Sequence, residues 1–234
     1  MSSAKTFVLV HGAWHGGWCW RRVADRLRVH GHVVYTPTLT GVGERSHLIR
    51  PDIDLDIQVT DIVNVIKWED LNDIVLVGHS YGGFVISGVA EQMESTISSI
   101  VYLDAFLPDD GQALADFWDP ERAKEQAKDA EAGVPMPPFS AELFQVNEKD
   151  RAWVDAKCTP HPPRCFTQRI KLTGARDRIA KKVYIYATGW PSHFTSSYEK
   201  AKSDPSWRLY EVPCGHDVMI DMPDRLTEIL EEVA

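Results

Sequence analysis

Cysteine is scarce in this sequence, at four residues in 234, which is too few for a disulfide framework in a chain of this length. No apolar run approaches the roughly 18–20 residues that a membrane-spanning helix needs. Basic residues are outnumbered as well: 25 lysines and arginines face 34 aspartates and glutamates, for a net charge of −9. A chain this acidic is repelled by phosphate groups, so we expect neither a nucleic-acid partner nor a membrane partner.

The first residues contain no apolar stretch of the kind found in signal peptides, and we therefore expect a cytoplasmic protein. The length indicates one domain, or one domain that carries a large insertion. Hydrophobic residues make up 44% of the chain, enough to offset the entropy lost on ordering it, which excludes intrinsic disorder. A homodimer stays open at this point.

Short β-branched runs alternate along the chain with helix-length amphipathic segments. We expect strands at Thr6–Val10, Val33–Tyr35, 74–77, 98–103, 182–187 and Trp207–Val212. We expect helices over about 20–30, after Asp54 as an N-cap, after residue 80, and over Pro223–Val233. Apolar strands separated by helices predict an α/β fold, with a mostly parallel sheet covered by helices on both faces.

The stretch from residue 107 to residue 179 breaks this alternation, because it contains no convincing core strand. It holds a charged helical run at Pro120–Ala132, typical of a solvated helix face, and two proline-rich patches. It is too long for a plain loop in a compact domain. We therefore interpret residues 107–179 as a helical cap over the carboxyl edge of the sheet, inserted into a core formed by residues 1–106 and 180–234.

The motif Gly78-His79-Ser80-Tyr81-Gly82 fits the pattern G-x-S-x-G, with a β-branched strand before it and a helical pattern after it. In this pattern the serine lies at a strained turn from strand to helix, and the glycines allow the turn to close. The N-terminus of the helix places backbone N–H groups where a negatively charged oxygen would form. Ser80 is therefore the candidate nucleophile.

A serine hydroxyl is a weak nucleophile and needs a base within hydrogen-bonding distance. His216 follows the last expected strand, which places it at the carboxyl edge of the sheet, where open α/β sheets carry their sites. The eight other histidines are less well placed. Five of them are expected at the surface or in loops and turns: His30, His32, His47, His161 and His193. The other three precede Ser80 in the chain or adjoin it: His11, His15 and His79.

An oxyanion hole in such a site combines the N–H of the residue after the serine with an N–H from the loop after the first strand. These residues are Tyr81 and Ala13, and Gly12 lets the backbone approach closely.

The chain resembles the α/β-hydrolase superfamily over nearly its whole length. The resemblance is carried, in the same order along the chain, by residues 7–20, by the serine turn at residues 78–83 and by Gly215-His216-Asp217. The nearest resemblance is to the branch that holds the small plant methylesterases, the hydroxynitrile lyases and their bacterial esterase relatives. The resemblance implies the α/β-hydrolase fold, a serine–histidine–acid triad and no cofactor. The oxyanion positions of that branch coincide with Ala13 and Tyr81.

The third member of the triad departs from the plant methylesterases, in which the acid lies a few residues after the penultimate core strand. Residues 187–194 contain no carboxylate, and Glu199 and Asp204 would have to turn back towards the site. Asp104 directly follows the expected strand 98–103 and keeps the chain order serine, acid, histidine. This position resembles the acid of some haloalkane dehalogenases, so we expect Asp104 to be the triad acid. The carboxylates expected to be solvated are Asp109, Asp110 and Asp217.

These residues predict a serine hydrolase that cleaves small carboxylic esters through an acyl-enzyme intermediate. Its substrate pocket should be apolar, with Trp14, Phe106 and Trp190 beside Tyr81 in loops at the carboxyl edge. Cap aromatics able to close over it are Phe117, Trp118, Phe139 and Phe144. Aromatic walls favour an aryl or short-acyl ester over a long lipid chain. Cleavage of amides or carbamates is a further alternative, because the same triad can cleave these bonds as well as esters.

Other functions on this fold are weaker alternatives. The hydroxynitrile lyases carry a threonine after the first-strand histidine and a lysine after the catalytic histidine, where this chain has Gly12 and Asp217. Without that cation, a leaving cyanide loses its charge stabiliser. A cofactor-free dioxygenase and a non-catalytic ligand-binding protein stay open, although the latter usually lacks a triad member and here Ser80 and His216 are both present.

No metal or nucleotide site is expected. Cys158 and Cys165 with His161 between them match no common zinc-site spacing. The run Gly41-Val42-Gly43 follows a short strand but opens no helix, and so fails the context of a dinucleotide-binding loop.

Overall fold

The computed structural model describes residues 4–190 and 194–234 and contains a six-stranded sheet in which every pairing is parallel. The strand order is β2-β1-β3-β4-β5-β6. The strands are β1 (Thr6–Val10), β2 (Val33–Tyr35), β3 (Ile74–His79), β4 (Ile97–Leu103), β5 (Lys181–Ala187) and β6 (Trp207–Val212). The predicted α/β fold is confirmed, with strand bounds close to those expected.

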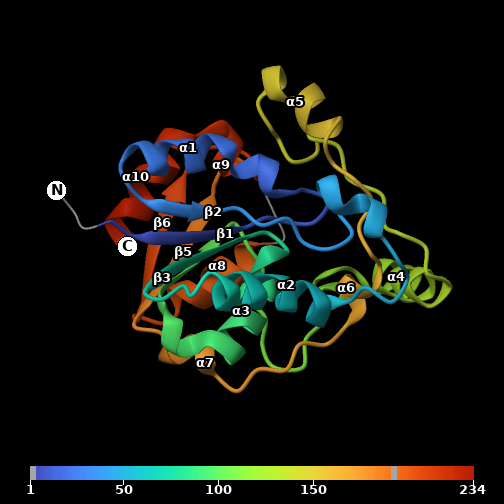
Figure 1. The fold of residues 1–234 in the computed structure, drawn as a ribbon. Helices are drawn as coiled ribbons and strands as arrows, with labels where there is room; N and C mark the ends of the chain where they lie inside the picture. The colour runs from blue at the N-terminus through green and yellow to red at the C-terminus, as the bar shows by residue number, and fades with distance from the viewer. Residues whose placement is uncertain (1–3, 191–193) are drawn as a thin grey trace.

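Helices cover both faces of this sheet (Figure 1). Helices α1 (Arg21–Val29) and α10 (Pro223–Val233) pack together on one face, whereas α2 (Leu55–Trp68) and α3 (Gly82–Met93) pack together on the other. The central strand β3 is buried along its whole length, because helices cover it from both sides. Asp54 is the N-cap expected for α2, since its side chain accepts a hydrogen bond from the N–H of Ile57 at 3.0 Å.

Shorter elements complete the part of the fold outside residues 104–180. They are the 3₁₀ turns η1 (Gly17–Trp20), η2 (Gly43–Leu48) and η3 (Glu94–Thr96), with helices α8 (Thr195–Lys202) and α9 (Val218–Asp221). In the part of the chain that the structure describes, no helix is both long and apolar enough to cross a membrane.

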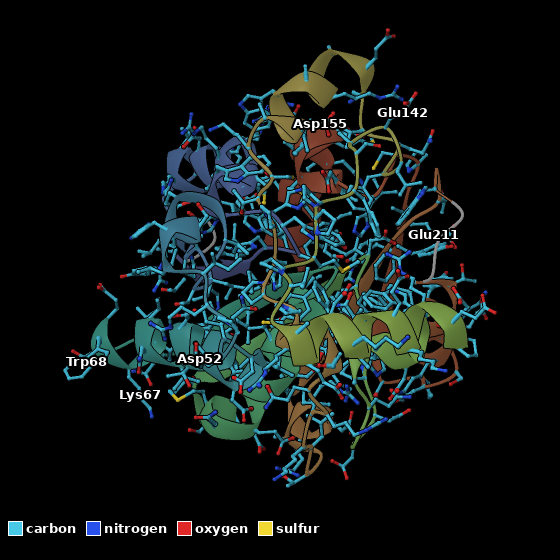
Figure 2. All side chains as sticks on the ribbon, turned by 90° about the vertical axis from the view of Figure 1, so that its right-hand side faces the viewer. Asp52, Lys67, Trp68, Glu142, Asp155 and Glu211 are labelled. Carbon is cyan, nitrogen blue, oxygen red and sulfur yellow. The ribbon has the colours of Figure 1, made fainter. Side chains whose placement is uncertain are left out.

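Residues 104–180, all of them described, add no strand to the sheet. They form η4 (Leu114–Phe117), α4 (Pro120–Ala132), α5 (Glu148–Asp155), α6 (Arg164–Thr167) and α7 (Ala175–Arg178). Helix α4 begins at the N-cap Asp119 with Pro120 in its first turn, and ends at Gly133, whose φ of 70° suits a residue without a side chain. Viewed from the right-hand side of Figure 1, α4 crosses the front of the molecule and α5 lies above it (Figure 2).

The strand order creates a natural crevice between β1 and β3. The chain leaves β1 towards β2 on one side, and it leaves β3 towards β4 on the other. The loops at the carboxyl ends of β1 and β3 therefore diverge, and open parallel sheets hold their ligands at such a point. The loop that contains Ala13 follows β1, and Ser80 follows β3.

Candidate active site

Ser80 lies in the turn between β3 and α3, in a left-handed backbone conformation with φ of 54°. A non-glycine residue rarely adopts this conformation, and it marks a strained turn. The glycines on either side are required by crowding. A Cβ on Gly78 would lie 2.6 Å from the carbonyl oxygen of Gly82, and a Cβ on Gly82 would lie 2.9 Å from the carbonyl oxygen of His11.

The candidate oxyanion donors are the N–H groups of Ala13 and Tyr81. Within residues 4–190 and 194–234, no protein atom accepts a hydrogen bond from either group. Tyr81 stands at the N-terminal end of α3, so its N–H belongs to the end of the helix that favours negative charge. The two residues come from the loops on opposite sides of the crevice between β1 and β3.

His216 and Asp104 form a direct buried hydrogen bond, although 112 residues separate them in the sequence. Nδ1 of His216 lies 2.7 Å from Oδ2 of Asp104, and the other carboxylate oxygen accepts a hydrogen bond from the N–H of Ala187 at 3.2 Å. Asp104 directly follows β4 and is fully buried, whereas His216 lies in the loop between β6 and α9. The acceptor on Nδ1 leaves Nε2 as the ring nitrogen free to take a proton from a hydroxyl.

Aromatic rings surround the His216 imidazole. The ring of Phe194 stacks on it at 4.9 Å with an interplanar angle of 9°, and Trp190 and Phe144 lie at 4.8 and 5.2 Å between centroids. This burial lowers the pKa of His216 below its ordinary value, which keeps the ring neutral and able to act as a base. Burial also raises the pKa of Asp104, while the N–H of Ala187 favours its charged form.

The carboxylates weighed against Asp104 lie elsewhere. Glu199 and Asp204 are exposed, as are Asp109 and Asp110. Asp217 is different from what its sequence position suggests, because it is fully buried rather than solvated. It faces inward from the loop after β6, and its Oδ2 lies 3.1 Å from Nε2 of His15.

Several histidines are also more deeply buried than expected. His32 is only 7% exposed, because it packs edge-on against Phe7, with ring centroids 5.3 Å apart, and its Nδ1 accepts a hydrogen bond from the N–H of Lys5. The buried histidines that gather around the β1 loop are His11, His15, His79 and His161. Sequence reasoning assigned none of them a role, since histidines far apart in the chain give no local signal of a shared environment. His193 lies outside the described residues.

A cavity of about 630 Å³ opens beside Ser80 and His216. The residues that line it are Ala13, Trp14, Ser80, Tyr81, Phe106, Leu114, Trp118, Arg122, Phe139, Leu143, Phe144, Phe166, Trp190, Phe194, Thr195 and His216. All the residues proposed from the sequence for the oxyanion hole and the pocket are therefore on its wall. Phe117 is not among them, and packs instead against Phe106 with ring centroids 5.0 Å apart.

Arg122 is a cavity residue that the sequence did not reveal. It belongs to the charged run of α4 that reads as a solvated face, but its guanidinium lies 4.8 Å from the ring of Trp118 and 4.6 Å from the ring of Phe139. Such distances are those of cation–π contacts. No local pattern distinguishes Arg122 from its charged neighbours, so only the fold brings it to the cavity.

One group of described residues has the composition of a metal site: His79, His216 and Asp217 bring ligand-type atoms within 4.8 Å of one another. Their protein partners argue for another use. His216 Nδ1 bonds Asp104, Asp217 Oδ2 bonds His15, and Nε2 of His79 donates to the carbonyl oxygen of His216 at 3.1 Å. Cys158, His161 and Cys165 do not form such a group.

Comparison with known proteins agrees with this architecture. Residues 7–229 match the family described as the alpha/beta hydrolase family. The chain is 44% identical to a carbendazim hydrolyzing esterase of Nocardioides sp. (strain SG-4G), over 96% of this chain and 97% of that protein. It is 26% identical to methylesterase 10 of Arabidopsis thaliana, over 97% of this chain and 91% of that protein.

A solved structure gives the same picture. An extracellular α/β-hydrolase from a Paenibacillus species, described as sharing structural and functional homology with tobacco salicylic acid binding protein 2, superposes with a TM-score of 0.84. The match covers 98% of this chain and 99% of that one, at 27% identity. From the sheet and helices, the crevice and these relatives, it follows that the chain belongs to the alpha/beta hydrolase family.

Proposed function

We propose that this carboxylic ester hydrolase attacks its substrates with Ser80, activated by His216 and Asp104. Oγ of Ser80 adds to the carbonyl carbon of the ester while Nε2 of His216 takes the hydroxyl proton. The N–H groups of Ala13 and Tyr81 bind the oxygen that becomes negative. The alcohol then leaves with the proton from His216, and a water molecule repeats the two steps to release the acid from the acyl-enzyme.

The observation that carries this proposal is the hydrogen bond between His216 and Asp104 at the wall of the cavity that Ser80 also lines. The carboxylate fixes the imidazole tautomer with its proton on Nδ1, so the other nitrogen can accept one. The left-handed turn at Ser80 supports the same reading, because a strained conformation is kept where it aims a reacting group.

The cavity favours small aromatic esters as substrates. Its volume of about 630 Å³ lies within the usual range for small-molecule sites, and aromatic and aliphatic side chains make most of its wall. Flat rings stack well on such walls, so an aryl or short-acyl ester fits better than a long lipid. Carbendazim enters the substrate panel, because a 44% identical relative is named for hydrolysing it.

We also propose that residues 107–179 act as a cap over this cavity. Seven of the lining residues come from this stretch: Leu114, Trp118, Arg122, Phe139, Leu143, Phe144 and Phe166. A cytoplasmic location and a homodimer stay predictions. Cell fractionation and the mass of the purified protein in solution test them.

Covalent labelling tests the nucleophile. A serine-directed aryl phosphonate should add one adduct mass to the native protein, located on Ser80 by peptide mapping, and should abolish hydrolysis of the ester panel. Ser80→Ala should show neither the adduct nor turnover. Ser87→Ala is the matched control, because Ser87 is a fully buried serine on α3 whose hydroxyl bonds the carbonyl oxygen of Gly83. Labelling of Ser80→Ala at the native rate would contradict the assignment.

A further inference from the structure

A second buried histidine–carboxylate pair lies beside the proposed triad. Nε2 of His15 is 3.1 Å from Oδ2 of Asp217, and Nδ1 of His15 is 2.8 Å from the carbonyl oxygen of Ala13. His15 is 1% exposed and Asp217 is fully buried. The pair therefore joins the loop after β1, which carries Ala13, to the loop after β6, in which Asp217 directly follows His216.

The partners of His15 require a proton on each of its ring nitrogens. A backbone carbonyl oxygen can only accept, and an ionised carboxylate can only accept. Although burial works against a charged ring, the Asp217 carboxylate raises the pKa of His15 above its ordinary value. His15 in turn holds the pKa of Asp217 below its ordinary value against the effect of burial. The pair is thus an imidazolium bound to a carboxylate, both away from water.

His15 holds one end of the peptide group between Ala13 and Trp14, and a different histidine holds the other end. The N–H of Trp14 donates to Nδ1 of His161 at 3.2 Å, on the far side of the carbonyl that His15 binds. Trp14 has a left-handed backbone with φ of 64°, which costs free energy and needs such support.

The preceding peptide group, between Gly12 and Ala13, is held in the same way. Nε2 of His11 accepts the N–H of Leu39 at 3.0 Å, so its proton is on Nδ1, which donates to the carbonyl oxygen of Gly12 at 2.8 Å. The carbonyl oxygens of Gly12 and Ala13 therefore both accept hydrogen bonds from histidine side chains. The N–H of Ala13, which points away from the Gly12 carbonyl across a planar peptide, is the group left for the substrate.

We propose that His15 is a positioning residue of the oxyanion hole, and that Asp217 keeps it in the form that donates from both ring nitrogens. This inference rests on the proposed function, because it assigns His15 the task of holding the Ala13 loop at the distance an oxyanion requires. The interaction counts mainly in the transition state, since a carbonyl oxygen accepts hydrogen bonds far more strongly once it is negatively charged. Loss of His15 should consequently lower kcat more than it raises KM.

Two variants and a matched control test the proposal. His15→Gln keeps a donor of similar length but cannot satisfy both acceptors, and Asp217→Asn removes the charge with little change of shape. His32→Gln is the control: His32 is likewise buried and bonded to a carboxylate, that of Glu231 at 3.2 Å, but it packs near the amino end of β1. If His15→Gln fails to fold, Asp217→Asn provides the same comparison.

The decisive measurement compares two inhibitors of the same shape. An aryl trifluoromethyl ketone forms a tetrahedral adduct with an oxyanion, whereas the corresponding secondary alcohol forms none. In both test variants we expect the ketone to bind at least about tenfold more weakly, but by less than the roughly 100- to 1,000-fold that loss of an oxyanion donor costs. Alcohol binding should stay within twofold of native, kcat should fall in parallel with ketone affinity, and His32→Gln should change neither.

Native ketone affinity in the two variants would overturn the inference, and so would an equal loss for ketone and alcohol, or a comparable loss in His32→Gln. Failure of the inference is distinct from failure of the proposed function. Phosphonate labelling of Ser80 should still occur in the His15 and Asp217 variants if only the positioning role is wrong. It should be absent from native protein if the nucleophile is wrong.

Discussion

The carbonyl oxygen of Phe144 accepts a hydrogen bond at 3.0 Å from the N–H of His216. Phe144 lies between β4 and β5, so a residue outside the sheet holds the backbone of the candidate base. The two backbones also approach closely beside this hydrogen bond, since a Cβ on Gly215 would lie 2.3 Å from the carbonyl oxygen of Gln145. The loop that carries His216 thus packs tightly against the segment between β4 and β5, and the ring of Phe144 also covers the His216 imidazole.

Asp104→Asn should retain the fold and lose most of the activity. The asparagine amide can donate a hydrogen bond to Nδ1 of His216, which would then place the ring proton on Nε2 and leave the ring without the unprotonated nitrogen that the proposed mechanism uses. Neutralising a triad acid in this way costs about 10⁴-fold in kcat, and we expect a loss of that order. Steady-state kinetics on the best aryl ester of the panel, with thermal unfolding to check the fold, measures the effect.

Asp204→Asn is the control for this substitution. Asp204 is exposed and its side chain accepts a hydrogen bond from the N–H of Ser206 at 2.9 Å, so its replacement should leave kcat within twofold. Native turnover in Asp104→Asn, combined with collapse of turnover in Asp204→Asn, would transfer the role to Asp204.

Activity should persist into mildly acidic solution. The proposed mechanism needs a neutral His216, and burial under Phe144, Trp190 and Phe194 lowers the pKa of His216 below the ordinary value of about 6.5. We therefore expect kcat/KM to rise with pH through an apparent pKa below 6.5 and to be constant at neutral pH. Rate measurements from pH 4 to 8 check this, and an acidic limb centred above 6.5 would contradict it.

Acid should also weaken the fold. Burial lowers the pKa values of His11, His79, His161 and His216 in the folded protein, so the unfolded chain binds more protons as the pH falls through about 6.5. Each such histidine contributes stability at neutral pH that is lost on acidification, at up to about 1.4 kcal/mol per pH unit. His15 acts in the opposite sense, because its raised pKa contributes stability that is lost as the pH rises through the folded-state value.

Denaturant unfolding at several pH values between 5 and 7 measures the balance. We expect the free energy of unfolding to decrease towards pH 5, because the four histidines with lowered pKa values outnumber the three groups whose raised pKa acts in the opposite sense over this range, His15, Asp104 and Asp221. His161→Gln should reduce the slope, since it removes one of the four. An unfolding free energy that does not change over this range, with the same profile in His161→Gln, would contradict this prediction.

Sequence patterns predicted the fold well because the signals are local. The run Thr6–Val10 is short, apolar and β-branched, and such runs form buried strands wherever helices flank them. The turn at Ser80 and the N-cap of α2 at Asp54 are likewise determined by a few adjacent residues. The resemblance to the alpha/beta hydrolases added the order of these parts, and the family match confirms it.

The rest of the candidate site depends on contacts between distant residues. Asp217 reads as a polar loop residue, and its burial follows only from a partner, His15, that lies 202 positions away in the sequence. Arg122 reads as one charge among many on α4, and only the packing of Trp118 and Phe139 brings it to the cavity. A single amino-acid sequence contains no local pattern from which contacts between such distant residues can be predicted.

The segment between β4 and β5 serves the site in two chemically separate ways. Its side chains line much of the cavity, whereas its backbone carbonyl at Phe144 fixes His216 and His161 accepts the N–H of Trp14. Replacing a lining residue such as Leu143 therefore changes the shape of the cavity and leaves those two attachments in place. Substrate range can diverge by point substitution within this segment, but deleting it would dismantle the reaction centre. Libraries for new ester specificity should vary its cavity-lining side chains, keep Asp104 and His161, and conserve its length.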